Sequence, residues 1–136
     1  MNRTIMLVIL SVAMGAIRRH YPQIALLADP QLTAAQQLVS ARHALQQRQP
    51  DDAIEQLQDV IEAVPQAAEP RYLLGQAYLM QRKPDLAIAA FQEALRLDPQ
   101  SGQAAAGLGA AYQAKGMKAE AEQAFRKAAE LGYQGN

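Results

Sequence analysis

The pattern of apolar and polar positions divides the chain into two parts. Residues 4–17 form an uncharged and mostly apolar run. From Ala34 onwards, apolar and small residues recur among polar ones at spacings that place them on one face of a helix. Alanine, the strongest helix former, is abundant, and β-branched residues are sparse beyond the apolar run. The pattern therefore predicts an all-α chain.

The chain from Ala34 onwards repeats itself at an interval of 34 residues. The interval joins seven pairs of identical residues, six between the last two copies and one, Pro65 with Pro99, between the first two. Three of the columns extend back into a weaker first copy with similar residues. Such a period is typical of a solenoid built from helical hairpins. The columns are Leu74 and Leu108, Gly75 and Gly109, Tyr78 and Tyr112, Ala87 and Ala121, Phe91 and Phe125, Ala94 and Ala128, and Pro65 and Pro99, with Ala53, Leu57 and Val60 in the first copy.

Each column has a packing role in a helical hairpin. Glycine has no side chain, so Gly75 and Gly109 let the second helix of each pair approach the first closely. The alanine column does the same from the second helix, and Phe91 and Phe125 fill the space between hairpins. Prolines mark the ends of second helices: Pro50 and Pro84 open them, where the missing N–H costs nothing, and Pro65 and Pro99 follow them.

These columns resemble the tetratricopeptide repeat, a 34-residue unit of two antiparallel helices. The resemblance covers three repeats, 34–67, 68–101 and 102–135. It implies an all-α, three-repeat helical-hairpin solenoid over 34–135, which follows a hydrophobic N-terminal helix at 1–21 and a connector at 22–33. We expect Thr33 to be the N-cap of the first helix of the array.

The first repeat departs most from the family pattern, because Ser40, Ala41 and Ala44 stand where Leu, Gly and Tyr are expected. The departures predict a looser first repeat within the same fold. Two further family positions are altered: Gln37, Arg71 and Ala105 replace a bulky residue near the start of each repeat, and glycine at the turn between paired helices survives only as Gly116, with Arg48 and Arg82 at the other two turns.

The two ends of the array also differ in sequence. We expect the second repeat to bury the outer side of its second helix and the third to expose a charged one, as a terminal repeat needs for solubility. The first repeat has no comparable polar cap, so the connector, a partner or a second copy is expected to cover it. The residues of this outer side are Leu86, Ile88 and Leu95 in the second repeat and Glu120, Glu122 and Ala129 in the third.

The apolar run at 4–17 has three interpretations. As a helix it spans about 21 Å, which is short of a hydrocarbon core of about 30 Å. It is a signal-anchor helix flanked by Arg3, Arg18 and Arg19, a cleaved signal peptide, or a helix packed on protein. We favour the anchor, because arginines just after a cleavage site oppose translocation. The anchor residues are Ile5, Leu7, Val8, Ile9, Leu10, Val12, Met14 and Ile17.

Charge and composition exclude several classes of function. Basic and acidic residues number 13 each, so the chain lacks the basic excess of a nucleic-acid binder. Cysteine is absent, which removes disulfides, thiolate metal sites and a cysteine nucleophile. His20 and His43 have no second ligand at helical spacing, and no catalytic or nucleotide-binding motif is present. We expect no catalytic, cofactor-binding or metal-binding residues.

The resemblance also implies where a partner binds, since the first helices of such arrays line a concave groove. A subset of the family holds acidic C-terminal peptides with Lys and Asn at fixed first-helix positions. Those positions here carry Leu38 and Arg42, Tyr72 and Gln76, and Ala106 and Ala110, so this clamp is missing. We expect a mostly apolar groove that suits an apolar or amphipathic helix or peptide, unless some of its residues pack inside the array. The groove residues are Leu38, Val39, Arg42, Tyr72, Gln76, Leu79, Ala106, Ala110 and Gln113.

The sequence thus predicts a non-catalytic protein–protein interaction scaffold or adaptor. We expect a membrane-anchored subunit or assembly factor of a larger complex. Association of the chain with further copies of itself is left open. By resemblance to short bacterial chains with an N-terminal anchor, the array is placed on the periplasmic side of the inner membrane. The alternative is a secreted or soluble module whose apolar segment is cleaved or packed on protein.

Overall fold

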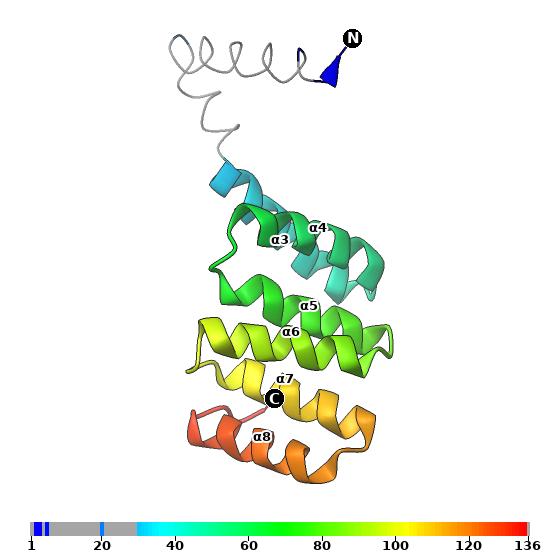
Figure 1. Ribbon diagram of the computed structural model, residues 1–136, viewed down its shortest axis with the longest axis vertical. Coiled ribbons are helices and arrows are strands. Elements are labelled where there is room, and N and C mark those ends of the chain that lie inside the picture. The colour runs from blue at the N-terminus through cyan, green and yellow to red at the C-terminus, as the bar shows by residue number, and fades with distance from the viewer. Residues whose placement is uncertain (1, 4, 6–19, 21–29, 136) are drawn as a thin grey trace.

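The computed structural model describes residues 2, 3, 5, 20 and 30–135 of the chain. Residues 30–135 form six α-helices and no strand, which confirms the all-α prediction. Consecutive helices run antiparallel and stack along the long axis of the molecule (Figure 1). The helices are α3 (Pro30–Gln46), α4 (Pro50–Ala63), α5 (Ala68–Met80), α6 (Pro84–Leu97), α7 (Gly102–Lys115) and α8 (Lys118–Glu130).

The helices pair into three hairpins, α3 with α4, α5 with α6 and α7 with α8. Each hairpin packs on the next, because α4 contacts α5 and α6 contacts α7. The first helices also touch one another, α3 against α5 and α5 against α7. The result is a short solenoid in which each repeat contacts its neighbours alone.

Local sequence explains where the helices begin. Pro50 and Pro84 occupy the first turns of α4 and α6 as predicted, and Ser101 caps α7 by accepting a hydrogen bond from the Ala104 backbone N–H at 3.1 Å. The prediction for α3 is wrong: this helix begins at Pro30, so Thr33 lies inside it and does not cap it. Proline at the first helical position starts the helix earlier than a threonine cap would.

The turns within the hairpins share one geometry. In each, the residue at the family's glycine position has a left-handed backbone, with φ of 57° at Arg48, 59° at Arg82 and 84° at Gly116. The backbone N–H of the following residue closes the turn by donating to a carbonyl of the first helix at 2.9 Å in all three cases. Two arginines therefore hold a conformation that favours glycine.

The core contains one aromatic wedge between two glycines. Phe91 of α6 is fully buried. A Cβ atom added to Gly75 of α5 would lie 2.7 Å from its ring, and one added to Gly107 of α7 would also overlap it. The glycine column thus does permit close approach, as predicted. In the first hairpin the equivalent positions hold Ala41 in place of the glycine and Leu57, which is smaller, in place of the phenylalanine. Both side chains are fully buried in one cluster.

Three expectations about the ends and flanks of the array are wrong. Of the three residues expected to be buried on the outer side of α6, Ile88 and Leu95 are partly buried, but Leu86 is 47% exposed. Phe125 is 40% exposed and does not lie between hairpins, since no helix of residues 30–135 follows α8. The outer face of the first hairpin is polar, with exposed His43, Asp52 and Glu55, so the start of the array does carry polar side chains.

The N-terminal predictions fall mostly outside the described residues. Of the anchor residues only Ile5 is described, and it is 54% exposed. Leu7, Val8, Ile9, Leu10, Val12, Met14 and Ile17 lie outside the described part of the chain. Within the described part, no helix has the length and apolar character needed to cross a membrane.

Candidate interaction surfaces

The predicted groove residues come from the three first helices, and some of them also pack against the core. Leu38 of α3 and Tyr72 of α5 pack partly against the cluster around Leu57, and Leu79 packs partly against Phe91. These three side chains therefore contribute to the junctions between repeats as well as to the surface. The sequence had left open that some groove residues pack inside the array, and each of these three side chains is partly buried in this way.

Tyr72 and Gln76 form a fixed pair at the second junction. The Tyr72 ring lies 6.0 Å from the Phe91 ring, with an angle of 51° between their planes. Its hydroxyl accepts a hydrogen bond from Gln76 Nε2 at 2.7 Å. Burial raises the pKa of Tyr72, Tyr133 adds to the shift, and the hydrogen bond from Gln76 opposes it. The polar end of Tyr72 is thus satisfied within its own helix.

A cavity of about 280 Å³ lies between α3 and α5, and it brings two predicted residues together. Arg42 and Gln76 line it, with Arg42 also paired to Glu69 of α5. The sequence did not single out the other four residues. Two of them could have been found by helical spacing, because Leu45 follows Arg42 by three residues on α3 and Leu73 precedes Gln76 by three on α5. These four are Leu45, Gln46, Leu73 and Met80, and Met80 is 37% exposed.

The remaining predicted residues do not line this cavity. Val39 is 65% exposed on α3, at the position that Leu73 occupies in the next repeat. Ala106 and Ala110 are partly exposed and Gln113 is exposed on α7. Their short or polar side chains leave the α7 part of the surface without a large apolar group, so the apolar part of the predicted groove is confined to α3 and α5.

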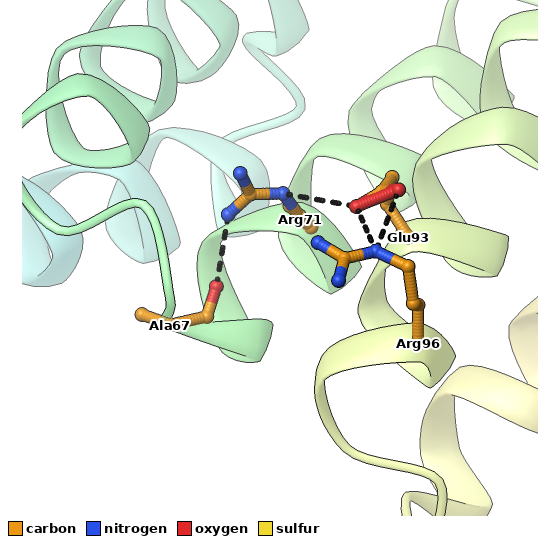
Figure 2. A network of polar contacts seen from close by, with 4 residues as sticks. All are labelled: Ala67, Arg71, Glu93 and Arg96. Atoms are coloured by element: carbon orange, nitrogen blue, oxygen red, sulfur yellow. Dashed lines mark hydrogen bonds and ion pairs between the residues drawn. The ribbon is translucent and has the colours of Figure 1, made fainter.

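Polar contacts join α5 to α6 beside the second junction. Arg71, in place of the family's bulky residue, donates to the Ala67 carbonyl at 3.2 Å and lies 3.9 Å from Glu93 (Figure 2). Arg96 donates to both Glu93 oxygens at 3.0 Å. The hydrogen bond from Arg96 is the main reason that the pKa of Glu93 is lowered. These ion pairs connect α5 to α6 on one side of the hairpin.

Polar contacts also link successive hairpins near the turns. Lys115 of α7 lies 2.6 Å from Asp85 of α6, whose carboxylate raises the Lys115 pKa. One repeat earlier, Gln81 donates to Asp51 in the equivalent place. These contacts are solvent-exposed, so each adds little stability. Within residues 2, 3, 5, 20 and 30–135, no group of three His, Asp or Glu side chains is placed to hold a metal ion.

Comparison with known proteins extends these observations. The tetratricopeptide repeat profile matches residues 38–102 and 72–135. A MamA structure (AMB-1) is 30% identical, with a TM-score of 0.69, and the match covers 91% of this chain and 74% of that chain. The second such domain of Spaghetti (RPAP3), bound to the HSP90 peptide SRMEEVD, is 25% identical with a TM-score of 0.70, over 73% of this chain and 92% of that one.

A third solved structure agrees in fold alone. The Arabidopsis OM64 domain is 19% identical with a TM-score of 0.73, and the match covers 76% of this chain and 86% of that chain. A search of curated proteins gives no match.

Proposed function

Because the chain belongs to the tetratricopeptide repeat family, we propose that it is a non-catalytic module that binds a protein partner through the first-helix face of α3 and α5. The cavity of about 280 Å³ between these helices carries the proposal. Leu45, Leu73 and Met80 give it an apolar lining, and Arg42 and Gln76 supply polar groups at its rim. An amphipathic helix or peptide matches such a lining, with apolar side chains inside and polar ones at the edge.

The alternative of an acidic C-terminal peptide is disfavoured by the residues at the clamp positions. The RPAP3 domain was solved with such a peptide, and that binding is a property of that protein. Here Leu38, Tyr72 and Ala106 stand where the clamp needs polar or basic side chains. Leu38 and Tyr72 also contribute to repeat packing. Arg42 is paired with Glu69, which reduces its availability to a carboxylate ligand.

The proposed module is a membrane-anchored subunit or assembly factor of a larger complex, with its array on the periplasmic side of a bacterial inner membrane. Support comes from the uncharged run at residues 4–17 and its flanking arginines. Carbonate extraction of membranes from cells that express the full chain tests this part. Retention in the pellet with an intact N-terminus supports the anchor, whereas a soluble product favours the secreted or soluble module.

Site-specific photocrosslinking tests the binding surface. A photoreactive amino acid replaces Met80 or Gln46 at the cavity, and Gln58 or Glu62 on α4 serves as the matched control, since both are exposed away from it. We expect one protein to crosslink from the cavity positions and not from the controls. Met80→Glu should abolish the crosslink from position 46, and Gln58→Glu should leave it unchanged. Crosslinks from the control positions alone would contradict the proposal.

A further inference from the structure

Two cavities lie along the surface that α3 and α5 form together. One of them is the cavity of about 280 Å³ already described, which we call the second cavity. The first cavity, of about 200 Å³, lies between the N-terminal halves of α3 and α5 and the end of α4. An apolar space of about 150 Å³ already holds a benzene-sized group, so each cavity has room for a large apolar side chain. The first cavity is lined by apolar residues, among them Leu38, Val60, Val64 and Pro70, and by Glu69.

The two cavities lie on the same side of both first helices. Residues seven or eight positions apart occupy nearly the same face of a helix, two turns apart. On α3, Leu38 lines the first cavity and Gln46, eight residues later, lines the second. On α5, Glu69 lines the first cavity and Gln76, seven residues later, lines the second. With a rise of about 1.5 Å per residue, the cavities are therefore roughly 10–12 Å apart along the helix axes.

One ion pair joins the two cavities. Glu69 lines the first cavity, Arg42 lines the second, and their side chains pair across α3 and α5. These side chains are 45% and 50% exposed, so a partner can reach both of them. A lone carboxylate or ammonium would compete with the existing pair. An adjacent acidic and basic residue would instead extend the pair into a network of four charges in which each has a partner.

We propose that this surface binds an amphipathic helix of a partner protein, with two large apolar side chains seven residues apart and an adjacent acidic and basic residue midway between them. On such a helix the apolar side chains are about 10.5 Å apart on one face, which matches the two cavities. The third and fourth residues after the first apolar one share this face and meet Arg42 and Glu69. This proposal rests on the proposed function, since it specifies the partner of that surface.

An extended peptide matches the surface less well than a helix. A strand rises about 3.3 Å per residue, so its two apolar side chains would be about four residues apart. Only one residue between them would point to the same side, and it could meet one charge of the ion pair but not both.

The order of the two charges on the partner sets the direction in which its helix lies. Its basic residue belongs beside Glu69 and its acidic residue beside Arg42. A helix in which the acidic residue comes first therefore lies antiparallel to α3, with its N-terminal end at the second cavity. A helix in which the basic residue comes first lies parallel to α3.

Nuclear magnetic resonance titration of the ¹⁵N-labelled full chain with alanine-rich helical peptides tests the proposal. The probe carries two leucines seven residues apart, with glutamate and lysine midway between them. The control has the same composition but its leucines are five residues apart, on different faces. We expect saturable shifts with the probe at amides of both cavities, such as Leu38 and Met80, and about tenfold weaker binding of the control. Equal affinity of the two peptides, or shifts confined to one cavity, overturns the proposal.

A spin label beside the first leucine reports the direction of the bound helix. With glutamate before lysine, the label should broaden the amide of Gln46, and with lysine before glutamate that of Ala34. The exchange Arg42→Glu with Glu69→Arg keeps an ion pair but reverses its order, so each peptide should then bind in the opposite direction. A direction that follows neither the peptide nor the protein exchange overturns the proposal.

A variant of the first cavity separates this proposal from the proposed function. Ala35→Phe, at an exposed position that lines the first cavity, should weaken probe binding about tenfold, whereas Gln58→Phe on the exposed face of α4 should leave it unchanged. Equal binding by the two folded variants overturns the two-cavity proposal. If photocrosslinking from Met80 still captures a protein in that case, the proposed function stands. Absence of that crosslink removes the proposed function as well.

Discussion

Phe91 and Phe125 occupy the same column of consecutive repeats, and yet Phe91 is fully buried and Phe125 is 40% exposed. Both rings cover a glycine of their own hairpin, Gly75 and Gly109 respectively. The difference comes from the next hairpin: α7 covers Phe91 with Gly107, and no helix of residues 30–135 covers Phe125. In this column the ring is therefore buried partly by its own repeat and partly by the one that follows.

The largest expected effect compares the two phenylalanines directly. Phe91→Ala should lower the free energy of unfolding by about 3–5 kcal/mol, because it removes a fully buried ring between two hairpins. Phe125→Ala should cost about 1–2 kcal/mol, since part of the ring is already in water. Urea denaturation followed by circular dichroism measures both. Equal losses would show that the terminal ring is as well covered as the inner one.

The glycines beneath the two rings should differ in the same direction. Gly75→Ala places a methyl group 2.7 Å from the Phe91 ring, which is held on both sides, and should cost about 1–3 kcal/mol. Gly109→Ala meets the Phe125 ring at 2.8 Å, but this ring can move towards solvent, so a loss below about 1 kcal/mol is expected. Thermal melts of the two single variants would contradict this if Gly109→Ala proved the more damaging.

Substitutions at two equivalent turns should change the free energy of unfolding by smaller amounts and in opposite directions. Arg82→Gly should stabilise the protein by about 1 kcal/mol, because a left-handed backbone costs an arginine more than a glycine. Gly116→Ala, at the equivalent turn of the last repeat, should destabilise the protein by a similar amount, about 1 kcal/mol. Alanine disfavours the φ of 84° at this position, and no atom lies within 4 Å of the added Cβ to offset the strain by a new contact. Denaturation midpoints measure both, and a destabilised Arg82→Gly protein would imply a contact of that arginine worth more than the strain.

The smallest expected effect concerns the charges of the second repeat. The pKa of Glu93 is lowered in the folded protein, chiefly by the hydrogen bond from Arg96. Its contribution is therefore present above the unfolded pKa of about 4.3 and is lost as the pH falls through the lower, folded value. Glu93→Gln should slightly reduce the melting temperature at pH 7, and this deficit should vanish in acid.

Glu130 is the matched control for this pH dependence. It takes the place of Arg96 in the third repeat and has no ion pair within residues 30–135. Glu130→Gln should leave the melting temperature nearly unchanged at every pH. A deficit of Glu93→Gln that persists below about pH 3 would mean that the side chain acts by packing and not by charge.

Much of the fold could be predicted from the sequence, because its 34-residue columns report contacts that every repeat makes. The glycine column marks a close approach, and prolines mark helix starts at Pro50 and Pro84. Contacts that depend on which repeat follows could not be predicted in this way. The burial of Phe125 was overestimated for this reason. The burial of Leu86 was also overestimated. The same repeat position holds Asp52 and Glu120 in the other repeats, which indicates that it faces solvent.

The candidate surfaces were less predictable than the fold. The family pattern placed Arg42 and Gln76 on one face, and the structure brings them to one cavity. It could not show that Tyr72 would be divided between surface and core, because this depends on the ring of Phe91 two helix turns into α6. A cleft of about 370 Å³ between α3 and α4 of the first hairpin was not predicted, because residue types alone do not show how their neighbours fill the space around them.

The wedge of Phe91 between Gly75 and Gly107 also fixes the order of the repeats along the chain. At the preceding junction the same three positions hold Ala41, Leu57 and Leu73, a smaller wedge against a larger facing residue. If the second and third units were exchanged by recombination, each wedge would face a residue selected for a different partner. The array is thus modular in architecture but not in sequence: each wedge shares its hairpin with one facing residue, so a duplicated or shuffled unit would have to match its wedge to the facing residue of the unit that follows.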